Sequence, residues 1–184
     1  MGNPLRVRRP IAELAARGQV IEIADKIGNF ERLAGIVEAD LSTLDPDKVP
    51  RDWRAAAVTG RLEFGFADAQ RQVPSLVGAV AATVDVVCQR CLEPFRLALA
   101  SELRLLPTTA EQGVSAGAGF EPWELDDDRV CPADIVEEVL IMAIPLSAMH
   151  DTAEACREFE PAGAGVERTA RPFAALKDRM DQDN

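Results

Sequence analysis

Two neighbouring runs of alternating residues constrain the fold of this chain more than any other feature. Apolar side chains occupy every second position from Val80 to Cys88, and again through most of the run from Phe95 to Leu105. Such alternation with one polar face predicts half-buried antiparallel strands. Only the residues QRCLEP separate the two runs, so we expect a hairpin, with Pro94 just before the returning strand.

The remaining patterns predict further strands and several short helices. Residues Val58 to Phe66 alternate in the same way, and Gln19 to Ile23 is a candidate for a brief strand. A first helix is expected over IAELAAR, after Pro10 and before Gly18, and a second over the segment that Asn29 can cap. A third is expected over DIVEEVLIMAIP, where Asp134 and Glu137 have capping-box spacing and Pro145 ends the helix. Together these elements predict an α+β fold. A helix packs on one face of an antiparallel sheet that carries a CxxC hairpin, and both termini are flexible.

The length of 184 residues is that of one domain. We expect residues 1–53 to form a helical and loop segment packed on a core of residues 54–160. Residues 107–121 are rich in Gly, Ala and Thr, which indicates a loop. Residues 161–184, which contain the motif PFAAL, are expected to form a flexible tail.

Charge is unevenly distributed along the sequence. The chain has 31 acidic and 20 basic residues, and its net charge of −11 argues against a general nucleic-acid coat. Eight acids and a single arginine lie within residues 121–138, whereas residues 1–9 hold three arginines and no acid. The acidic segment and the basic segment are each a candidate partner-binding surface.

The acidic segment is expected to dock a basic protein, because opposite charge favours association. The basic segment is either a solvated tail or a contact to RNA phosphates. The residues concerned are Asp126, Asp127 and Asp128 in the acidic segment and Arg6, Arg8 and Arg9 in the basic one. We favour docking through the acidic face.

The sequence predicts a cytoplasmic protein with no membrane partner. No apolar run approaches the roughly 20 residues needed to span a bilayer, and the N-terminal sequence lacks the apolar stretch of a secretory signal. Thiols stay reduced in the cytosol. The four cysteines are therefore expected to be metal ligands, redox groups or packing residues rather than disulfides.

The spacing Cys88-Gln-Arg-Cys91 is the clearest chemical motif. A two-residue spacer lets both sulfur atoms reach one metal ion, and a hairpin tip is where zinc knuckles place such pairs. His150 and Cys156 follow the predicted helix and would complete a Cys₃His zinc site. The alternative is that the cysteines only pack in the core, as is expected of Cys131.

Other chemistry is less well supported by the sequence. A redox role of the CxxC is the weaker alternative, since thioredoxin-like motifs lie where a strand opens into a helix, whereas here a strand follows. There is no phosphate-binding glycine loop and no nucleophile motif around His150. We therefore expect a binding protein rather than an enzyme.

The order of several motifs resembles the YceD family, the large ribosomal RNA subunit accumulation proteins. The motifs are VVCQRCLEPF, then DIVEEVLIMAIPLSAMHD, then Cys156 and finally RPFAALK, and the resemblance covers about residues 54–180. In many relatives the cysteine pattern resembles a metal site, with CxRC as the first pair and a second CxxC after the helix. Here His150 and Cys156 replace that second pair, which implies either a Cys₃His variant or a site that has lost its metal. Arg90 matches the arginine of CxRC and could contact a phosphate or carboxylate, or cap a local carbonyl.

The resemblance implies a non-enzymatic factor of bacteria and plastids, required for large-subunit ribosomal RNA to be processed or to accumulate. The expected partners are large-subunit rRNA or its precursor particle, and a basic ribosomal or rRNA-maturation protein. The alternative is a small zinc-binding or thiol-redox protein with an unrelated cytosolic role.

Overall fold

The computed structural model describes residues 3–109, 119–125, 127–152 and 155–156, and its centre is a five-stranded sheet. The strand order is β2-β3-β4-β5-β6, and all neighbours are antiparallel except β5 and β6, which are parallel. The strands are β2 (Val20–Lys26), β3 (Ala57–Phe66), β4 (Pro74–Val87), β5 (Pro94–Thr109) and β6 (Glu121–Leu125). A separate two-stranded sheet pairs β1 (Arg9–Pro10) with β7 (Arg129–Val130).

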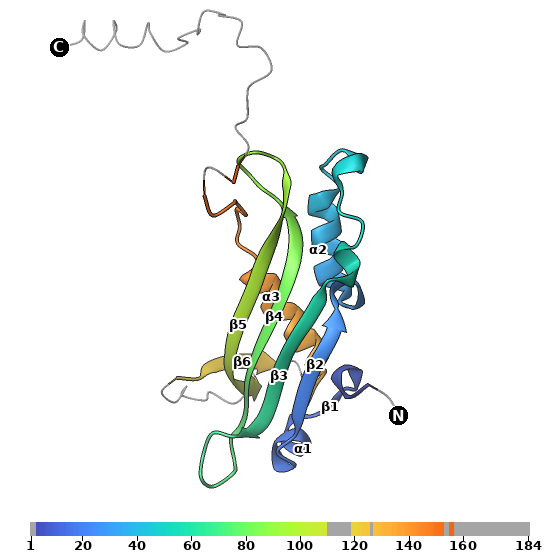
Figure 1. The fold of residues 1–184 in the computed structure, drawn as a ribbon. Helices are drawn as coiled ribbons and strands as arrows, with labels where there is room; N and C mark the ends of the chain where they lie inside the picture. The colour runs from blue at the N-terminus through green and yellow to red at the C-terminus, as the bar shows by residue number, and fades with distance from the viewer. Residues whose placement is uncertain (1–2, 110–118, 126, 153–154, 157–184) are drawn as a thin grey trace, which may run out of the picture.

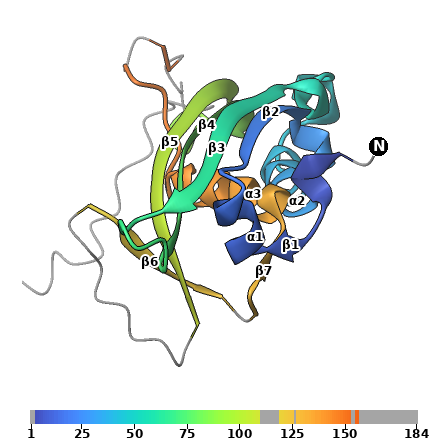
Figure 2. The same cartoon turned by 90° about the horizontal axis from the view of Figure 1, so that it is seen from below.

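The helices lie together on one side of the curved sheet (Figures 1 and 2). They are α1 (Ile11–Ala16), α2 (Glu31–Leu41) and α3 (Pro132–Ala143), with the short 3-10 helices η1 (Pro4–Arg6), η2 (Ile27–Asn29), η3 (Pro46–Lys48) and η4 (Trp53–Ala55). The predicted α+β class, with an antiparallel sheet covered by helix on one face, is therefore confirmed. None of the described helices is long and apolar enough to cross a membrane.

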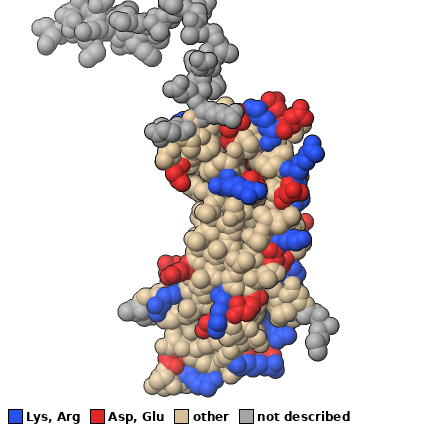
Figure 3. Space-filling model, in the orientation of Figure 1, with Lys and Arg blue, Asp and Glu red and all other residues tan. Residues whose placement is uncertain are grey.

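The core lies between the sheet and the helices, as the alternation of the strands predicts. It includes Val58, Leu62, Val80, Val84 and Leu99 from the strands, Leu33 and Val37 from α2, and Val136 and Leu140 from α3. Complete burial of such a side chain contributes about 1.5–3 kcal/mol. The opposite face of the sheet is open and lined by small residues such as Ala79, Ala81 and Ala100, and few charged atoms lie at its centre (Figure 3).

The predicted hairpin is present, but both of its strands are longer than the alternation indicates. The register pairs Val86 with Phe95, while β4 begins at Pro74 and β5 continues to Thr109. Gly78 interrupts the pattern of β4, because it faces Leu62 and Leu103 in neighbouring strands. A Cβ atom on Gly78 would lie 2.5 Å from the carbonyl oxygen of Arg61, so the close approach of the strands requires glycine here.

The N-terminal segment contributes an edge strand to the main sheet. The helix after Pro10 ends as predicted at Gly18, whose φ of +56° is a left-handed conformation that glycine adopts without strain. The predicted strand at residues 19–23 is extended to Lys26 and pairs with β3 along its whole length.

Two capping predictions are wrong. The Asn29 side chain donates to Asp25 instead of capping α2, which begins after Phe30. Asp134 does not cap α3, whose N-cap is Cys131 without a side-chain hydrogen bond. The carboxylate of Glu137 in α3 caps α2 across the helix interface in place of Asn29. α3 already begins at Pro132, so Asp134 lies within its first turn.

Some predictions concern residues outside the described part of the chain. These are most of the predicted loop at 107–121, Asp126, and the predicted tail with its PFAAL motif. The described ends of that loop belong to strands, since β5 includes residues 107–109 and β6 begins at Glu121.

Candidate metal centre

The hairpin between β4 and β5 places two cysteines at one end of the sheet. The N–H of Cys88 donates to the carbonyl of Glu93 at 3.0 Å, and the N–H of Leu92 donates back to the carbonyl of Cys88 at 2.9 Å. Leu92 has a φ of +57°, the left-handed backbone that closes this tight turn. The turn brings Cys91 back beside Cys88, and both side chains are buried.

The segment after α3 supplies the other half of the site. It leaves the helix at Pro145 and runs toward the hairpin tip (Figure 1). The carbonyl of Ala148 accepts a hydrogen bond from the N–H of Gln89 at 2.9 Å. The His150 ring lies against Phe95 of β5, with the ring centroids 4.6 Å apart and the planes inclined by 35°. These two contacts fix His150 beside the cysteines.

The four residues that the sequence predicts as ligands converge. The Sγ atoms of Cys88, Cys91 and Cys156 and a ring nitrogen of His150 all lie within 4.8 Å of one another. Cys88 Sγ is 3.7 Å from Cys156 Sγ, and His150 Nδ1 is 3.6 Å from Cys91 Sγ and 3.5 Å from Cys156 Sγ. All four cysteines of the chain are free thiols.

These separations fit a tetrahedral ion. Metal–sulfur bonds of about 2.3 Å and metal–nitrogen bonds of about 2.0–2.1 Å at tetrahedral angles place ligand atoms about 3.8 Å apart for two sulfurs and about 3.6 Å apart for sulfur and nitrogen. The distances between the thiols and the imidazole agree with both values. The donor set of three sulfurs and one nitrogen is also one that soft or borderline transition metals prefer. Three of the separations thus match tetrahedral geometry and all four donor atoms lie within 4.8 Å of one another, so small side-chain shifts would let the cluster hold a metal ion.

Two thiols of the cluster have strongly perturbed pKa values. Burial raises the pKa of Cys88, but hydrogen bonds from the backbone N–H groups of Cys91, His150 and Arg90 and from the His150 side chain outweigh it and lower the pKa from 9.0 to about 5. Burial, followed by hydrogen bonds and charge from Cys88 and Cys91, raises the pKa of Cys156 to about 11. The site is thus prepared to hold a thiolate, the form that binds metals.

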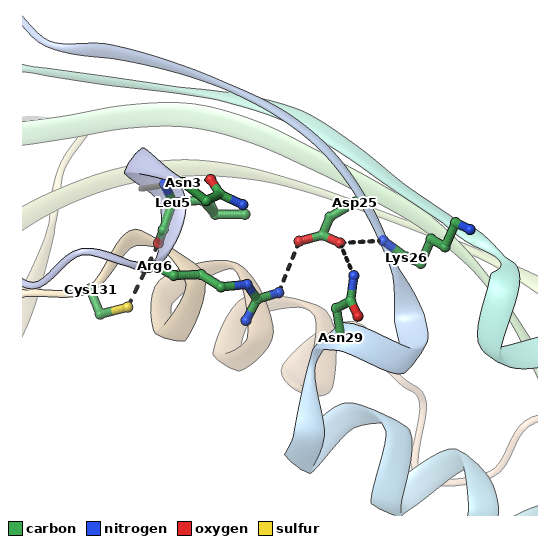
Figure 4. A network of polar contacts seen from close by, with 7 residues as sticks. All are labelled: Asn3, Leu5, Arg6, Asp25, Lys26, Asn29 and Cys131. Atoms are coloured by element: carbon green, nitrogen blue, oxygen red, sulfur yellow. Dashed lines mark hydrogen bonds and ion pairs between the residues drawn. The ribbon is translucent and has the colours of Figure 1, made fainter. Parts of the chain in front are cut away.

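Cys131 lies apart from the cluster, in agreement with the prediction that it is a packing residue. Its Sγ donates to the carbonyl oxygen of Leu5 at 3.7 Å, at the start of α3 (Figure 4). It provides a natural control thiol, because it contacts none of the four candidate ligands among the interactions described.

Arg90 lies at the exposed tip of the hairpin. Its Nη2 atom is 4.0 Å from the sulfur of Met149, so the side chain packs across the segment that leads to His150. The residue as a whole is exposed.

The acidic and basic segments of the sequence lie beside each other instead of on separate surfaces. Antiparallel pairing of β1 with β7 brings Arg8 to 3.4 Å from Asp127, and the Arg129 guanidinium donates to the carbonyl of Arg8 at 3.0 Å. Asp128 is exposed, and its carbonyl accepts from the N–H of Ile11. Part of each charged segment is therefore neutralised by the other.

Arg6 is also engaged within the protein. Its guanidinium lies 2.9 Å from Asp25, which also accepts from the backbone N–H of Lys26 and from Asn29 (Figure 4). Burial raises the pKa of Asp25, but these hydrogen bonds and the charge of Arg6 lower it more. Arg9 is half-buried in β1 and pairs with Val130.

Sequence reasoning missed the buried carboxylate of Glu137. It accepts hydrogen bonds from the backbone N–H groups of Arg32 at 2.7 Å and Leu33 at 3.0 Å. The Arg32 guanidinium forms ion pairs with both Glu137 and Glu138. The available signal was that Glu137 lies between apolar residues on the stripe of α3, where an unpaired acid would be costly.

Comparisons with known proteins agree with the motifs of the hairpin and α3. The sequence model of the family described as large ribosomal RNA subunit accumulation protein YceD matches residues 76–182. A curated protein of that description from Haemophilus influenzae is 31% identical over 118 residues, which are 60% of this chain and 67% of the relative. No solved structure matches the chain. All four candidate metal ligands lie within the matched range.

Proposed function

This chain belongs to the YceD family of large ribosomal RNA subunit accumulation proteins, and from that premise we propose that it is a non-enzymatic cytoplasmic factor that assists large-subunit rRNA processing by binding the precursor particle. The observation that carries the proposal is the family match, which spans both halves of the Cys₃His cluster. The relative from Haemophilus influenzae bears the name of an rRNA accumulation protein.

We assign the cluster a structural zinc ion. Zinc suits three thiolates and one imidazole in tetrahedral geometry, and the distances between the donor atoms support this choice. Four protein ligands leave no coordination position for a substrate, which is the mark of a structural rather than a catalytic site. The ion would join the β4–β5 hairpin to the segment around His150 and Cys156 and hold Arg90 at the exposed tip.

Thiol-redox activity is the alternative that the low pKa of Cys88 favours. Reactive thiols are partly exposed, whereas the Cys88 side chain has an exposed fraction of 0%. The turn at Cys88 also leads into β5 and not into a helix. These observations support a structural role for the pair.

A basic protein of the particle is the partner that the charge distribution favours. The net charge of −11 opposes direct association with RNA. Arg6 and Arg8, the proposed RNA contacts, already form ion pairs with Asp25 and Asp127. Because Asp127 is paired with Arg8, it is less suited to docking than the sequence indicates. Arg90 and the remaining exposed acids are therefore the candidate contacts.

The test is to remove the protein from cells and measure mature and precursor large-subunit rRNA relative to small-subunit rRNA. We expect mature large-subunit rRNA to fall and its precursors to accumulate. Expression of the wild-type chain or the Cys131→Ser variant should restore both levels, whereas His150→Ala should not. Unchanged rRNA levels after removal would contradict the proposed function.

A further inference from the structure

The outer edge of β5 is only partly covered. β5 extends from Pro94 to Thr109 and pairs with β4 through residues 94–105, whereas β6 covers only residues 105–109. Residues 94–104 therefore have no strand partner on their outer side within the described part of the chain. Edge strands of this length are normally shielded, because their free N–H and C=O groups can pair with another chain.

The opposite edge of the sheet is better protected. β2 has seven residues, includes Glu22, Asp25 and Lys26, and has η1 packed against it. The ion pair between Arg6 and Asp25 fastens η1 to this strand (Figure 4). Short length, charge and a covering segment are the usual means of closing an edge. β5 carries the charges of Arg96, Glu102 and Arg104, but it is long and has no covering strand over residues 94–104 within the described part of the chain.

A groove of about 900 Å³ lies beside residues 101–105 of β5, at one end of its open part, between β5, β6 and α3. We call it the β5–α3 groove. Its apolar lining includes Leu103, Leu105, Trp123, Val139 and Met142. Met142 is 76% exposed within the described part of the chain and extends the apolar lining to the surface.

The charge around the groove is negative. Its acidic lining residues are Glu102, Glu121, Asp134 and Glu138. The two arginines of the lining are already engaged, since Arg32 pairs with Glu137 and Glu138 and the guanidinium of Arg104 lies over the Phe120 ring, 4.9 Å from its centroid. Of the four acids, only Glu138 forms an ion pair within the described residues. A cationic partner is favoured.

We propose that an extended basic segment of a protein partner binds in the β5–α3 groove as an additional strand along β5. The partner's backbone would pair with residues 94–104, in the manner of strand addition to an open sheet edge. Alternate side chains would face the apolar lining near Leu103 and Val139, and the others would face Glu102 on the open side of the sheet. The two arginines on that side are engaged, since Arg96 lies 3.8 Å from Asp85 and Arg104 lies over the Phe120 ring. The recognised segment therefore alternates apolar and basic residues. The inference rests on the proposed function for the identity of the particle and deepens it by naming the docking site.

Binding of a synthetic peptide of alternating valine and lysine to the full chain tests the groove directly. We expect binding to protect alternate β5 amides among residues 94–104 from hydrogen exchange. A peptide with the same side chains but N-methyl groups on alternate residues should fail to bind, because it cannot complete the strand pairing. A valine–glutamate peptide should also fail.

Matched variants assign the binding to the groove. Met142→Ser and Glu102→Lys should each weaken peptide binding about tenfold. Leu146→Ser, at a fully exposed apolar residue outside the groove lining, and Asp47→Lys, in η3, should bind as the wild type does. Equal binding by all four variants, or undiminished binding of the N-methyl peptide, would overturn the proposal.

Other occupants give distinct results. Protection of the alternate β5 amides in the free monomer would show that another part of this chain covers the edge, and a concentration-dependent dimer lost in Met142→Ser would show self-pairing. Both would overturn the proposal.

Co-sedimentation with precursor particles distinguishes failure of the groove proposal from failure of the proposed function. If the wild type and the groove variants sediment equally with particles, the groove proposal fails while the function stands. If the peptide binds the groove but no particle is bound, the proposed function fails.

Discussion

Cys91 and His150 lie 59 positions apart in the sequence, yet Cys91 Sγ is 3.6 Å from His150 Nδ1. One belongs to the β4–β5 hairpin and the other follows α3, so the contact joins the same two segments as the hydrogen bond from Gln89 to Ala148. The proposed metal centre depends on this convergence.

Replacement of Cys156 by serine should remove one ligand and release the metal. Loss of a group that only orients a ligand costs about 10–100-fold in affinity, so loss of a direct ligand should cost at least as much. Competition with a chromophoric chelator measures the change. Cys131→Ser is the matched control and should retain wild-type affinity, because Cys131 lies outside the cluster. Equal affinity of the two variants would contradict the assignment.

The stability of the metal-free protein should increase with pH between about pH 5 and pH 9. The folded protein holds the pKa of Cys88 at about 5, below its ordinary value of 9.0. The stabilising contribution of the thiolate is therefore complete above pH 9 and is lost as the pH falls through 5. Urea unfolding across this range should give a positive slope that is smaller in Cys88→Ser. A slope unchanged by that substitution would show that other groups account for it.

The pKa of Cys156 is shifted in the opposite direction, so its contribution to stability has the opposite pH dependence. Its pKa is raised to about 11 in the folded protein, so the contribution of its neutral thiol is complete below pH 9 and is lost as the pH rises through 11. We expect the metal-free wild type to lose stability in that alkaline range and Cys156→Ser to lose less. Thiolate absorbance of the folded protein, followed against pH, should show the two ionisations well separated.

Glu137→Ala should lower the free energy of unfolding by about 2–3 kcal/mol, because it leaves two N–H groups of the first turn of α2 without their acceptor. Those groups belong to Arg32 and Leu33. Glu138→Ala removes only an exposed ion pair with Arg32 and should cost less than about 1 kcal/mol. Urea denaturation compares the variants, and similar losses in both would contradict the capping role.

The local part of the fold was predictable from the sequence, because alternation and the Cys88–Cys91 spacing are local patterns. The resemblance and the position of His150 and Cys156 after the helix indicated the four ligands that the structure brings together. The pairing of Arg8 with Asp127 was not predictable, since it joins residues 119 positions apart through two very short strands. β6 was missed for a related reason. Its sequence EPWEL has the polarity of a loop, and only its pairing with β5 makes it a strand.

The zinc content of the purified full chain tests the metal centre most directly. Elemental analysis should find close to one zinc ion per chain, and a strong chelator should remove the ion and lower the melting temperature, because a metal that binds only the folded state stabilises it. In His150→Ala both the zinc and the effect of the chelator should be lost. Protein that contains no metal, takes up none when zinc is added and melts at the same temperature with and without zinc would contradict the account.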